Sequence, residues 1–212
     1  MGLECVRASF AALKKIKKIN ITENRKNVQT NADLASHSAI INVLRKSKFK
    51  LSIDSEEADK VIMVNGGNDN FLVIIDPIDN TQFYLRGENS FCSVCLMFII
   101  DGEAKYSFVG DIVTEDIYYC DEKYAYKNNV KIRIGDASIG KKFILGYAPY
   151  EPRFSKFIKF VKGLKDCIFY NFGGQLHTVK IVSGQYDAYV EVIPEELQEF
   201  CGALIVKRAG GF

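Results

Sequence analysis

Hydrophobic residues in the N-terminal part of the chain recur at the spacing of one helical face. The first such pattern consists of Leu3, Val6, Phe10, Leu13 and Ile16. It predicts a half-buried helix, which a mostly polar connector at 20–27 follows. A second helix is expected to begin near Asn31. Its apolar positions are Leu34, Ile40, Ile41 and Leu44.

The middle of the chain changes to short apolar runs separated by turn residues, which is typical of strands. Strands are predicted at 61–64 and 71–75, and the Asn- and Gly-rich segment between them predicts a hairpin turn. From Ser90 onward the pattern indicates an antiparallel sheet. Its expected strands are 90–99, 104–112, 117–120, 124–127 and 131–134, with turns at 101–102 and 128–129.

The last third of the chain alternates between strand and helix patterns. Strands are predicted at 142–147, 168–171 and 188–192, and helices at 155–164, 175–183 and 195–208. Ala209-Gly210-Gly211 is expected to end the last helix. The order of elements predicts a layered α+β architecture. We expect two closely packed parts, an N-terminal α+β part at 1–135 and a C-terminal α/β part at 136–212.

Composition narrows the class of protein without identifying it. Of the 212 residues, 48% are apolar and 25% are charged, which predicts a conventional globular core. The net charge of +2 gives no broad basic face, so nucleic acid is not expected as a partner. No secretory segment or membrane-length apolar run is found, which favours a cytoplasmic protein without membrane contact. The six cysteines are expected to be reduced and structural, with Cys92 and Cys95 on opposite faces of a strand.

The segment Ile75-Asp76-Pro77-Ile78-Asp79-Asn80-Thr81 carries the most chemical information. It follows an apolar run that is predicted to be a buried strand, so two acids lie where the chain begins to turn. Two carboxylates and the carbonyl of Ile78 are hard oxygen ligands that suit Mg²⁺. Buried paired acids are costly unless a cation compensates them. The sequence therefore predicts the metal centre of a phosphate-cleaving enzyme.

Two other acidic motifs do not match this spacing. A haloacid-dehalogenase phosphatase uses D-x-D-x-T, but the residue two positions after Asp76 is Ile78. An EF-hand loop that begins at Asp76 needs glycine at its sixth position, which is Thr81.

Five segments together resemble the inositol monophosphatase-like family, which includes fructose-1,6-bisphosphatases and 3′(2′),5′-bisphosphate nucleotidases. The family pattern is T-x-x-D, then G-E-E, then D-P-[IL]-D-G-T, then G-x-x-D-A-Y-x-E, then W-D before a helix that ends in A-G-G. The corresponding segments here are 30–33, 55–57, 76–81, 184–191 and 209–211. The resemblance runs from about residue 27 to Phe212 and implies a layered α-β-α-β sandwich of the sugar-phosphatase type.

The resemblance also implies roles for individual residues. Glu56, Asp76 and the Ile78 carbonyl would bind one Mg²⁺, and Asp76 and Asp79 would bind a second about 4 Å away. Asp33 and Thr81 would form a hydrogen-bonded pair that orients the attacking water, with help from Glu56. Substrate would meet the backbone amides of Asn80 and Thr81, together with Gly174 and Glu191. Two or three Mg²⁺ ions per site and inhibition by Li⁺ are the family expectation.

Taken one at a time, these residues have simpler interpretations. Asp33 could be a first-turn acid that favours the helix dipole, and Thr81 could be an N-cap. Glu56 and Glu191 could face solvent. His177 is expected to be structural. Arg86, Arg153 and Lys156 are candidates for contact with a second phosphate, although the simpler interpretation of each as a solvated surface cation is favoured.

Among the departures of the chain from the family pattern, three affect the expectations for the site and the assembly. Asn80 replaces the usual glycine, and asparagine tolerates a positive φ better than most residues. The acid of the W-D motif falls at Gln198, which is neutral; Glu199 could replace it only if the helix start changes register. The chain also ends at Phe212, soon after A-G-G. We therefore expect a homodimer, in which a second chain covers the exposed edge.

The sequence predicts a Mg²⁺-dependent phosphomonoesterase acting on a small phosphorylated polyol or sugar, such as inositol monophosphate or fructose 1,6-bisphosphate. Two alternatives stay open. The protein could be a 3′(2′),5′-bisphosphate nucleotidase, or a family member that has lost catalysis and acts as a metal-dependent binding protein.

Overall fold

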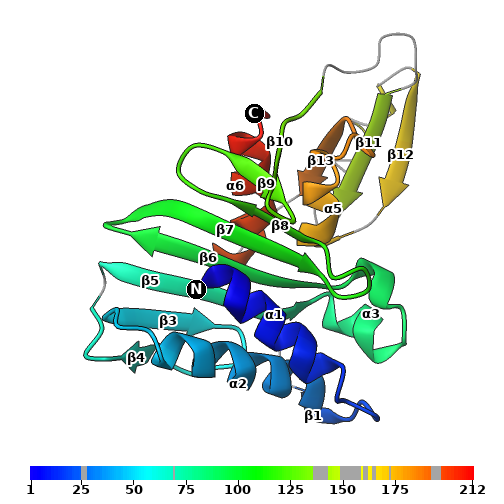
Figure 1. Ribbon diagram of the computed structural model, residues 1–212. Helices are drawn as coiled ribbons and strands as arrows, with labels where there is room; N and C mark the ends of the chain where they lie inside the picture. Colours follow the sequence, from blue (N-terminus) through cyan, green and yellow to red (C-terminus); the bar gives the residue numbers. More distant parts are fainter. Residues whose placement is uncertain are drawn as a thin grey trace.

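The computed structural model describes residues 1–24, 28–68, 70–135, 143–148, 159, 162–163, 166–171, 173–191 and 197–212. Helices and sheets alternate in layers (Figure 1). Helices α1 (Gly2–Leu13) and α2 (Asn31–Arg45) cover one face of an eight-stranded sheet. Helices α5 (Gln175–Val179) and α6 (Cys201–Arg208) cover the other face, and a three-stranded sheet lies beyond α5. The predicted layered α+β sandwich is confirmed.

The start of α2 is fixed by its own sequence. Thr30 is the N-cap, and its hydroxyl accepts hydrogen bonds from the backbone N–H groups of Ala32 and Asp33. The Asp33 carboxylate in turn accepts from the Thr30 backbone N–H at 2.8 Å. This capping box satisfies donors that a helix start leaves open, which explains why the predicted start at Asn31 is correct.

The large sheet has the strand order β10-β9-β8-β7-β6-β5-β3-β4. Its strands are β3 (Leu51–Ser55), β4 (Ile62–Val64), β5 (Phe71–Asp79), β6 (Ser93–Ile100), β7 (Glu103–Asp111), β8 (Ile117–Cys120), β9 (Ala125–Lys127) and β10 (Val130–Ile132). The pairs are antiparallel except β3 with β5. The expected turns have positive φ at Asp101, Gly102, Asn128 and Asn129.

The predicted hairpin between 61–64 and 71–75 is wrong. Strand β3 lies between β4 and β5, pairs antiparallel with β4 and runs parallel to β5. Leu51 and Ile53 are fully buried in β3, although polar and charged residues surround that segment in the sequence. Burying these two side chains favours insertion of β3 over a local hairpin.

Four further short elements were missed. The polar connector contains β1 (Ile21–Asn24), which forms an antiparallel pair with β2 (Val28–Thr30). A short helix, α3 (Thr81–Leu85), follows the acidic segment, and the 3₁₀ turn η1 (Asn89–Phe91) leads into β6.

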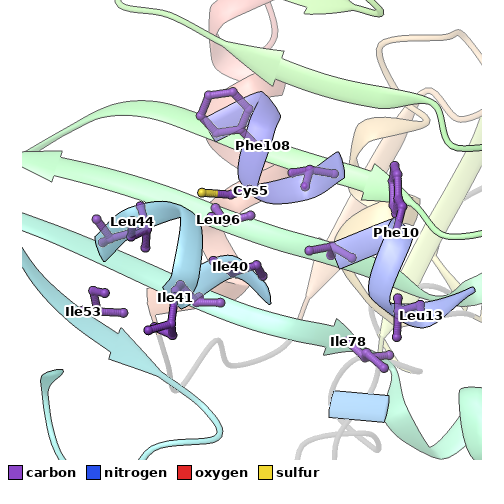
Figure 2. Packing of buried hydrophobic residues seen from close by; sticks show 14 of the residues in the cluster. Cys5, Phe10, Leu13, Ile40, Ile41, Leu44, Ile53, Ile78, Leu96 and Phe108 are labelled. Carbon is purple, nitrogen blue, oxygen red and sulfur yellow. The ribbon is translucent and has the colours of Figure 1, made fainter. Parts of the chain in front are cut away.

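The large sheet separates two hydrophobic clusters. The first lies against α1 and α2 and includes Phe10, Ile40 and Leu96 (Figure 2). The second lies against α5 and α6 and includes Leu176 and Ile205. Each face of β6 therefore packs against helices, as its buried apolar run requires.

The cysteines follow the same division. Cys92 lies just before β6 instead of within it and belongs to the first cluster, whereas Cys95 lies in β6 and belongs to the second, so the two side chains lie on opposite faces of the sheet. All six cysteines are free, and all except the half-buried Cys167 are buried.

The small sheet has the order β12-β11-β13 and is parallel. Its strands are β11 (Phe143–Ala148), β12 (Cys167–Asn171) and β13 (Ala188–Glu191). A 3₁₀ turn, η2 (Leu197–Phe200), leads directly into α6, so the predicted helix at 195–208 begins later than expected. Helix α5 ends at Val179, earlier than the predicted 183. The predicted helix at 155–164 falls mostly outside the described residues, as do Arg153 and Lys156.

None of the helices in the described ranges is long and apolar enough to cross a membrane.

Candidate active site

The acidic segment lies at the irregular end of β5. The strand continues to Asp79 rather than ending at Ile75 as predicted. Asp76 pairs with Cys95 and Asp79 with Ser93, so two residues of β5 lie opposite one residue of β6. Such a bulge bends a strand and redirects its side chains. The Pro77 carbonyl, inside the bulge, accepts a hydrogen bond from the Ser36 hydroxyl of α2 at 2.9 Å.

Asp33, Thr81 and the Ile78 carbonyl meet at the start of α3. The Thr81 hydroxyl oxygen lies 2.8 Å from the Ile78 carbonyl and 3.2 Å from an Asp33 carboxylate oxygen. A hydroxyl has one proton to donate, so only one of these two oxygens receives it at a time. Burial raises the pKa of Asp33, whereas hydrogen bonds from Thr30 and Thr81 oppose that rise. Asp33 therefore both caps α2 and faces Thr81.

Asn80 turns the chain between the two acids and α3. Its φ of 68° and ψ of 42° are left-handed, which confirms that asparagine accepts the conformation expected of the usual glycine. Its side-chain amide donates to the backbone carbonyls of Phe91 and Gly173, each at 2.8 Å. Asn80 therefore ties the acidic turn to the segment before α5, a link that glycine could not make.

Asp79 is held by donors from two other elements. One of its carboxylate oxygens accepts from the Ser93 hydroxyl at 2.8 Å and from the Gln175 backbone N–H at 2.7 Å. Burial raises the pKa of Asp79 to about 6, although these hydrogen bonds act in the opposite direction. Gly174 lies against the same carboxylate, with φ at 104° and ψ at 162°. A Cβ at Gly174 would lie 2.7 Å from the Asp79 oxygen.

Asp76 is at the centre of the negative charge. It is 7% exposed, and one of its oxygens accepts from the Ile78 backbone N–H at 3.1 Å. Burial raises its pKa well above the ordinary value, and the charges of Glu56, Asp79 and Asp33 raise it further. Glu56 follows β3, where its backbone N–H donates to the Ile75 carbonyl at 3.1 Å, and its side chain is exposed. Acids from α2, from the turn after β3 and from β5 therefore influence one another in one region.

Two acids from the C-terminal part of the chain extend this region. Burial raises the pKa of Glu191 to about 7, and the charges of Glu199 and Asp79 contribute to the rise. Glu199 lies in η2, immediately before α6. A 3₁₀ turn has three residues per turn instead of 3.6, so side-chain directions there differ from those of a continuous α-helix. The sequence required a change of register for Glu199 to replace Gln198, and the 3₁₀ turn is compatible with such a change.

The donor set fits a hard divalent cation by its chemistry. It consists of carboxylate and carbonyl oxygens, and burial and mutual repulsion disfavour the charged form of Asp76 in the absence of a cation. However, in the part of the chain that the structure describes, no three His, Cys, Asp or Glu side chains form a ready-made set of ligands. The acids thus share a region without forming a complete coordination shell. Glu56, Asp76, Asp79, the Ile78 carbonyl and Glu199 are the groups that could bind metal.

Several supporting residues were not found from the sequence. His37, one turn after Asp33 on α2, has its Nδ1 atom 2.9 Å from the hydroxyl of Ser55, the residue before Glu56. The side-chain oxygen of Gln175 accepts from the Gly202 backbone N–H at 2.7 Å, so Gln175 joins Asp79 to the start of α6. The spacing of Asp33 and His37 on one helical face was an available signal for His37. Nothing local in the sequence indicates Gln175.

Arg86 and His177 lie in different environments, since Arg86 is exposed and His177 is buried. Arg86 is the C-cap residue of α3 and is exposed. His177 is buried, stacks on Phe91, and lies 3.3 Å from the Tyr186 hydroxyl. Burial lowers the pKa of His177 to about 4, consistent with a structural role.

Comparison with known sequences identifies relatives along almost the whole chain. A family model described as "Inositol monophosphatase family" matches residues 3–212. A Pasteurella multocida protein named Nus factor SuhB is 27% identical over 189 residues, which cover 86% of this chain and 69% of that protein. A "Fructose-1,6-bisphosphatase/inositol-1-monophosphatase" from Archaeoglobus fulgidus is 25% identical over 188 residues, which cover 85% of this chain and 67% of that protein.

Solved structures share the fold at lower identity. The extragenic suppressor protein suhB from Bartonella henselae has a TM-score of 0.80 at 17% identity, covering 99% of this chain and 82% of that chain. An IMPase from Thermotoga maritima has a TM-score of 0.78 at 22% identity, with the same coverage. These likenesses show the fold.

Proposed function

This chain belongs to the inositol monophosphatase family, and we propose that it is a Mg²⁺-dependent phosphomonoesterase acting on a small phosphorylated polyol or sugar. The observation that carries the proposal is the grouping of Asp76 with the charges of Glu56, Asp79 and Asp33 at the bulged end of β5. A buried site with several like charges suits a reaction that needs bound cations.

Different residues of the chain would bind the metal and orient the attacking water. Glu56, Asp76, Asp79, Glu199 and the Ile78 carbonyl would bind Mg²⁺, which when bound lowers the pKa of water and offsets charge on the leaving oxygen. The Thr81 hydroxyl, donating to Asp33, would present its oxygen to a proton of the attacking water and so orient it.

Groups around Thr81 and Asp33 would orient the substrate. The backbone N–H groups of Asn80 and Thr81 lie at the start of α3, where donors favour a phosphate oxygen. Gly174 leaves room beside Asn80 because it carries no side chain. Glu191 would accept a hydrogen bond from a substrate hydroxyl. Water attacks phosphorus, the ester P–O bond breaks, and orthophosphate and the alcohol are released.

The direct test is phosphate release from a panel of substrates in the presence of Mg²⁺. The panel is myo-inositol 1-phosphate, fructose 1,6-bisphosphate and adenosine 3′,5′-bisphosphate. We expect turnover of the inositol or sugar phosphate and inhibition by Li⁺. Preference for the adenosine substrate would instead indicate a nucleotidase.

A second candidate is a binding protein that has lost catalysis. It is favoured by Gln198, a neutral residue where the family pattern has an acid, and relatives named Nus factor are among those found. Folded protein that turns over none of the three substrates but is still stabilised by Mg²⁺ would support this candidate.

Replacing Thr81 tests the orientation of water. Thr81→Val keeps the shape but removes the hydroxyl, and we expect kcat to fall by about 10²–10⁴-fold because the proton of the water loses its acceptor. Thr81→Ser keeps the hydroxyl and should retain most of the activity. Steady-state kinetics of both variants are the measurement. Full activity in Thr81→Val would show that the hydroxyl is not needed. A loss in Thr81→Ser as large as that in Thr81→Val would show that the hydroxyl alone is not sufficient.

Mg²⁺ should stabilise the fold, and the effect should grow with pH. The pKa of Asp79 is about 6 in the folded chain against 3.8 ordinarily, so without metal the folded state binds more protons between these values. Stability without metal therefore falls as the pH rises through this window. Above it the acids are charged and bind cations, so Mg²⁺ at about a hundred times its Kd should add about 3 kcal/mol.

Thermal unfolding with Mg²⁺ or with EDTA, at about pH 5 and about pH 8, checks this expectation. A stabilisation by Mg²⁺ that is equal at both pH values would contradict it.

A further inference from the structure

A polar cavity lies between the β9–β10 hairpin and the end of α6, and the acids of the candidate active site are not among its lining residues. Its volume is about 350 Å³. The backbone N–H of Ile134, just after β10, donates to the Ala209 carbonyl at 3.0 Å and joins the two walls. Figure 1 shows β9, β10 and α6 side by side near the C-terminus. The cavity thus has walls from two elements far apart in the sequence.

Positive charge is concentrated in this cavity. Five cations line it, and no acidic residue is among its described lining residues; the cations are Lys123, Lys131, Arg133, Lys207 and Arg208. The whole chain has a net charge of only +2, so this is a local excess. The ion pairs between described residues, such as Lys105–Glu103 and Lys127–Asp116, use other side chains. Two of the five cations have an acid nearby. Lys105 and, more weakly, Arg208 lower the pKa of Glu103, and Lys123 contributes, against the effect of burial, to the lowered pKa of Asp121. The charges of Lys131, Arg133 and Lys207 are not offset in this way among the described residues, and like charges around one concavity repel each other unless an anion offsets them.

Part of this excess has a local explanation. Lys207 and Arg208 lie in the last turn of α6, where cations interact favourably with the helix dipole. That explanation does not extend to Lys131 or Arg133, which come from the hairpin and the segment after it. The hairpin therefore brings additional positive charge to a helix end that already has its own cations.

The shape of the cavity favours a compact anion over a nucleic-acid strand. A volume of about 350 Å³ is at the lower end of the range of small-molecule pockets. Tyr124 is the aromatic ring in the wall, and the Lys131 ammonium lies 2.9 Å from its ring centroid. One face of the ring is therefore occupied by a cation and is closed to a stacking base. Single-stranded nucleic acid is usually bound along an extended groove with several open aromatic faces.

We propose that this cavity is a binding site for a small anion carrying two or more linked phosphates. Lys131 and Arg133 bind it from the hairpin, and Lys207 and Arg208 bind it from α6. Linked phosphates place several charges within the reach of cations on both walls, whereas one orthophosphate contacts fewer of them. The site is separate from the candidate metal site and does not depend on the proposed function.

The probe for this site is inorganic triphosphate, titrated into the full chain by calorimetry in EDTA without divalent cations. EDTA keeps metal-dependent binding at the acidic site out of the measurement. We expect the double variant K131Q/R133Q to bind at least tenfold more weakly than the original chain. Orthophosphate should bind more weakly than triphosphate, and added salt should weaken both.

The matched control is K17Q/K18Q, which removes the same charge from exposed lysines that follow α1. Its affinity for triphosphate should equal that of the original chain. The altered residues are exposed in both double variants, and unfolding temperatures check that both remain folded. Equal affinity of K131Q/R133Q and the original chain would overturn the proposal. Tighter binding of a single-stranded RNA oligonucleotide, lost in K131Q/R133Q, would overturn it in favour of a nucleic-acid surface.

Discussion

Asp76→Asn is expected to lower phosphate release by at least about 10³-fold while making the metal-free protein more stable. The asparagine oxygen can still accept from the Ile78 backbone N–H, so the bulge is kept. The loss of charge removes a metal ligand, which explains the loss of activity. It also removes a carboxylate that burial and the charges of Glu56, Asp79 and Asp33 disfavour, which explains the gain in stability.

The gain in stability of Asp76→Asn over the original chain should increase with pH. Burial raises the pKa of Asp76 in the folded chain. The carboxylate therefore does not destabilise the fold at low pH, where it is protonated, and it destabilises the fold increasingly as the pH rises. In EDTA, the unfolding temperature of Asp76→Asn should exceed that of the original chain at about pH 8, and the difference should shrink toward about pH 4. Mg²⁺ should no longer stabilise the variant.

Asp54→Asn is the matched control, since Asp54 is an exposed acid on the neighbouring strand β3. It should change neither activity nor the response to Mg²⁺. A fully active Asp76→Asn variant would remove Asp76 from the ligand set. A variant less stable than the original chain in EDTA would show that the Asp76 carboxylate has a structural role.

Gly174→Ala is expected to destabilise the protein and to impair the site together. The backbone there has φ 104° and ψ 162°, a region that essentially only glycine adopts, and the strain costs about 1–3 kcal/mol. An added Cβ would also lie 2.1 Å from the Asn80 side-chain nitrogen and 2.7 Å from an Asp79 oxygen. Relief of this overlap must move one of these residues. A shift of about 1 Å in a catalytic group can lower kcat by about 10²-fold.

Gly102→Ala separates the effect of backbone strain from the effect of overlap with neighbouring side chains. Gly102 has φ 78° in the β6–β7 turn, and an added Cβ would meet no atom within 4 Å. This control should lose about 1 kcal/mol of unfolding free energy and no activity. Urea unfolding and kcat are the measurements. If Gly174→Ala behaves like Gly102→Ala, the contact with Asp79 and Asn80 has no part in the site.

Features that depend on a few neighbouring residues were predictable from the sequence. The capping box of Thr30 and Asp33 fixed the start of α2, and the positive φ of Asn80 followed from the side chain's tolerance of that conformation. The acids at 76 and 79 were assigned to the end of an apolar strand, where they lie. Each of these depends on backbone preferences and hydrogen bonds within about one turn of chain.

Features that depend on distant residues were decided by the tertiary structure. The local turn signal at 65–70 predicted a hairpin, but burial of Leu51 and Ile53 placed β3 between its two strands. The 3₁₀ turn that contains Glu199 was not predicted either; burial, and then the charge of Glu199, raises the pKa of Glu191.

By itself, therefore, the sequence indicated the candidate acids of the site and placed them next to an apolar strand, although β5 continues to Asp79 instead of ending at Ile75. The tertiary structure decided which other elements complete the site: the Gln175 backbone N–H and Gly174 against Asp79, and Ser36 against the bulge. The physical reason is that turn and capping preferences act over a few residues. Strand order and the packing around a buried carboxylate are set by hydrophobic burial and hydrogen bonding across the whole chain.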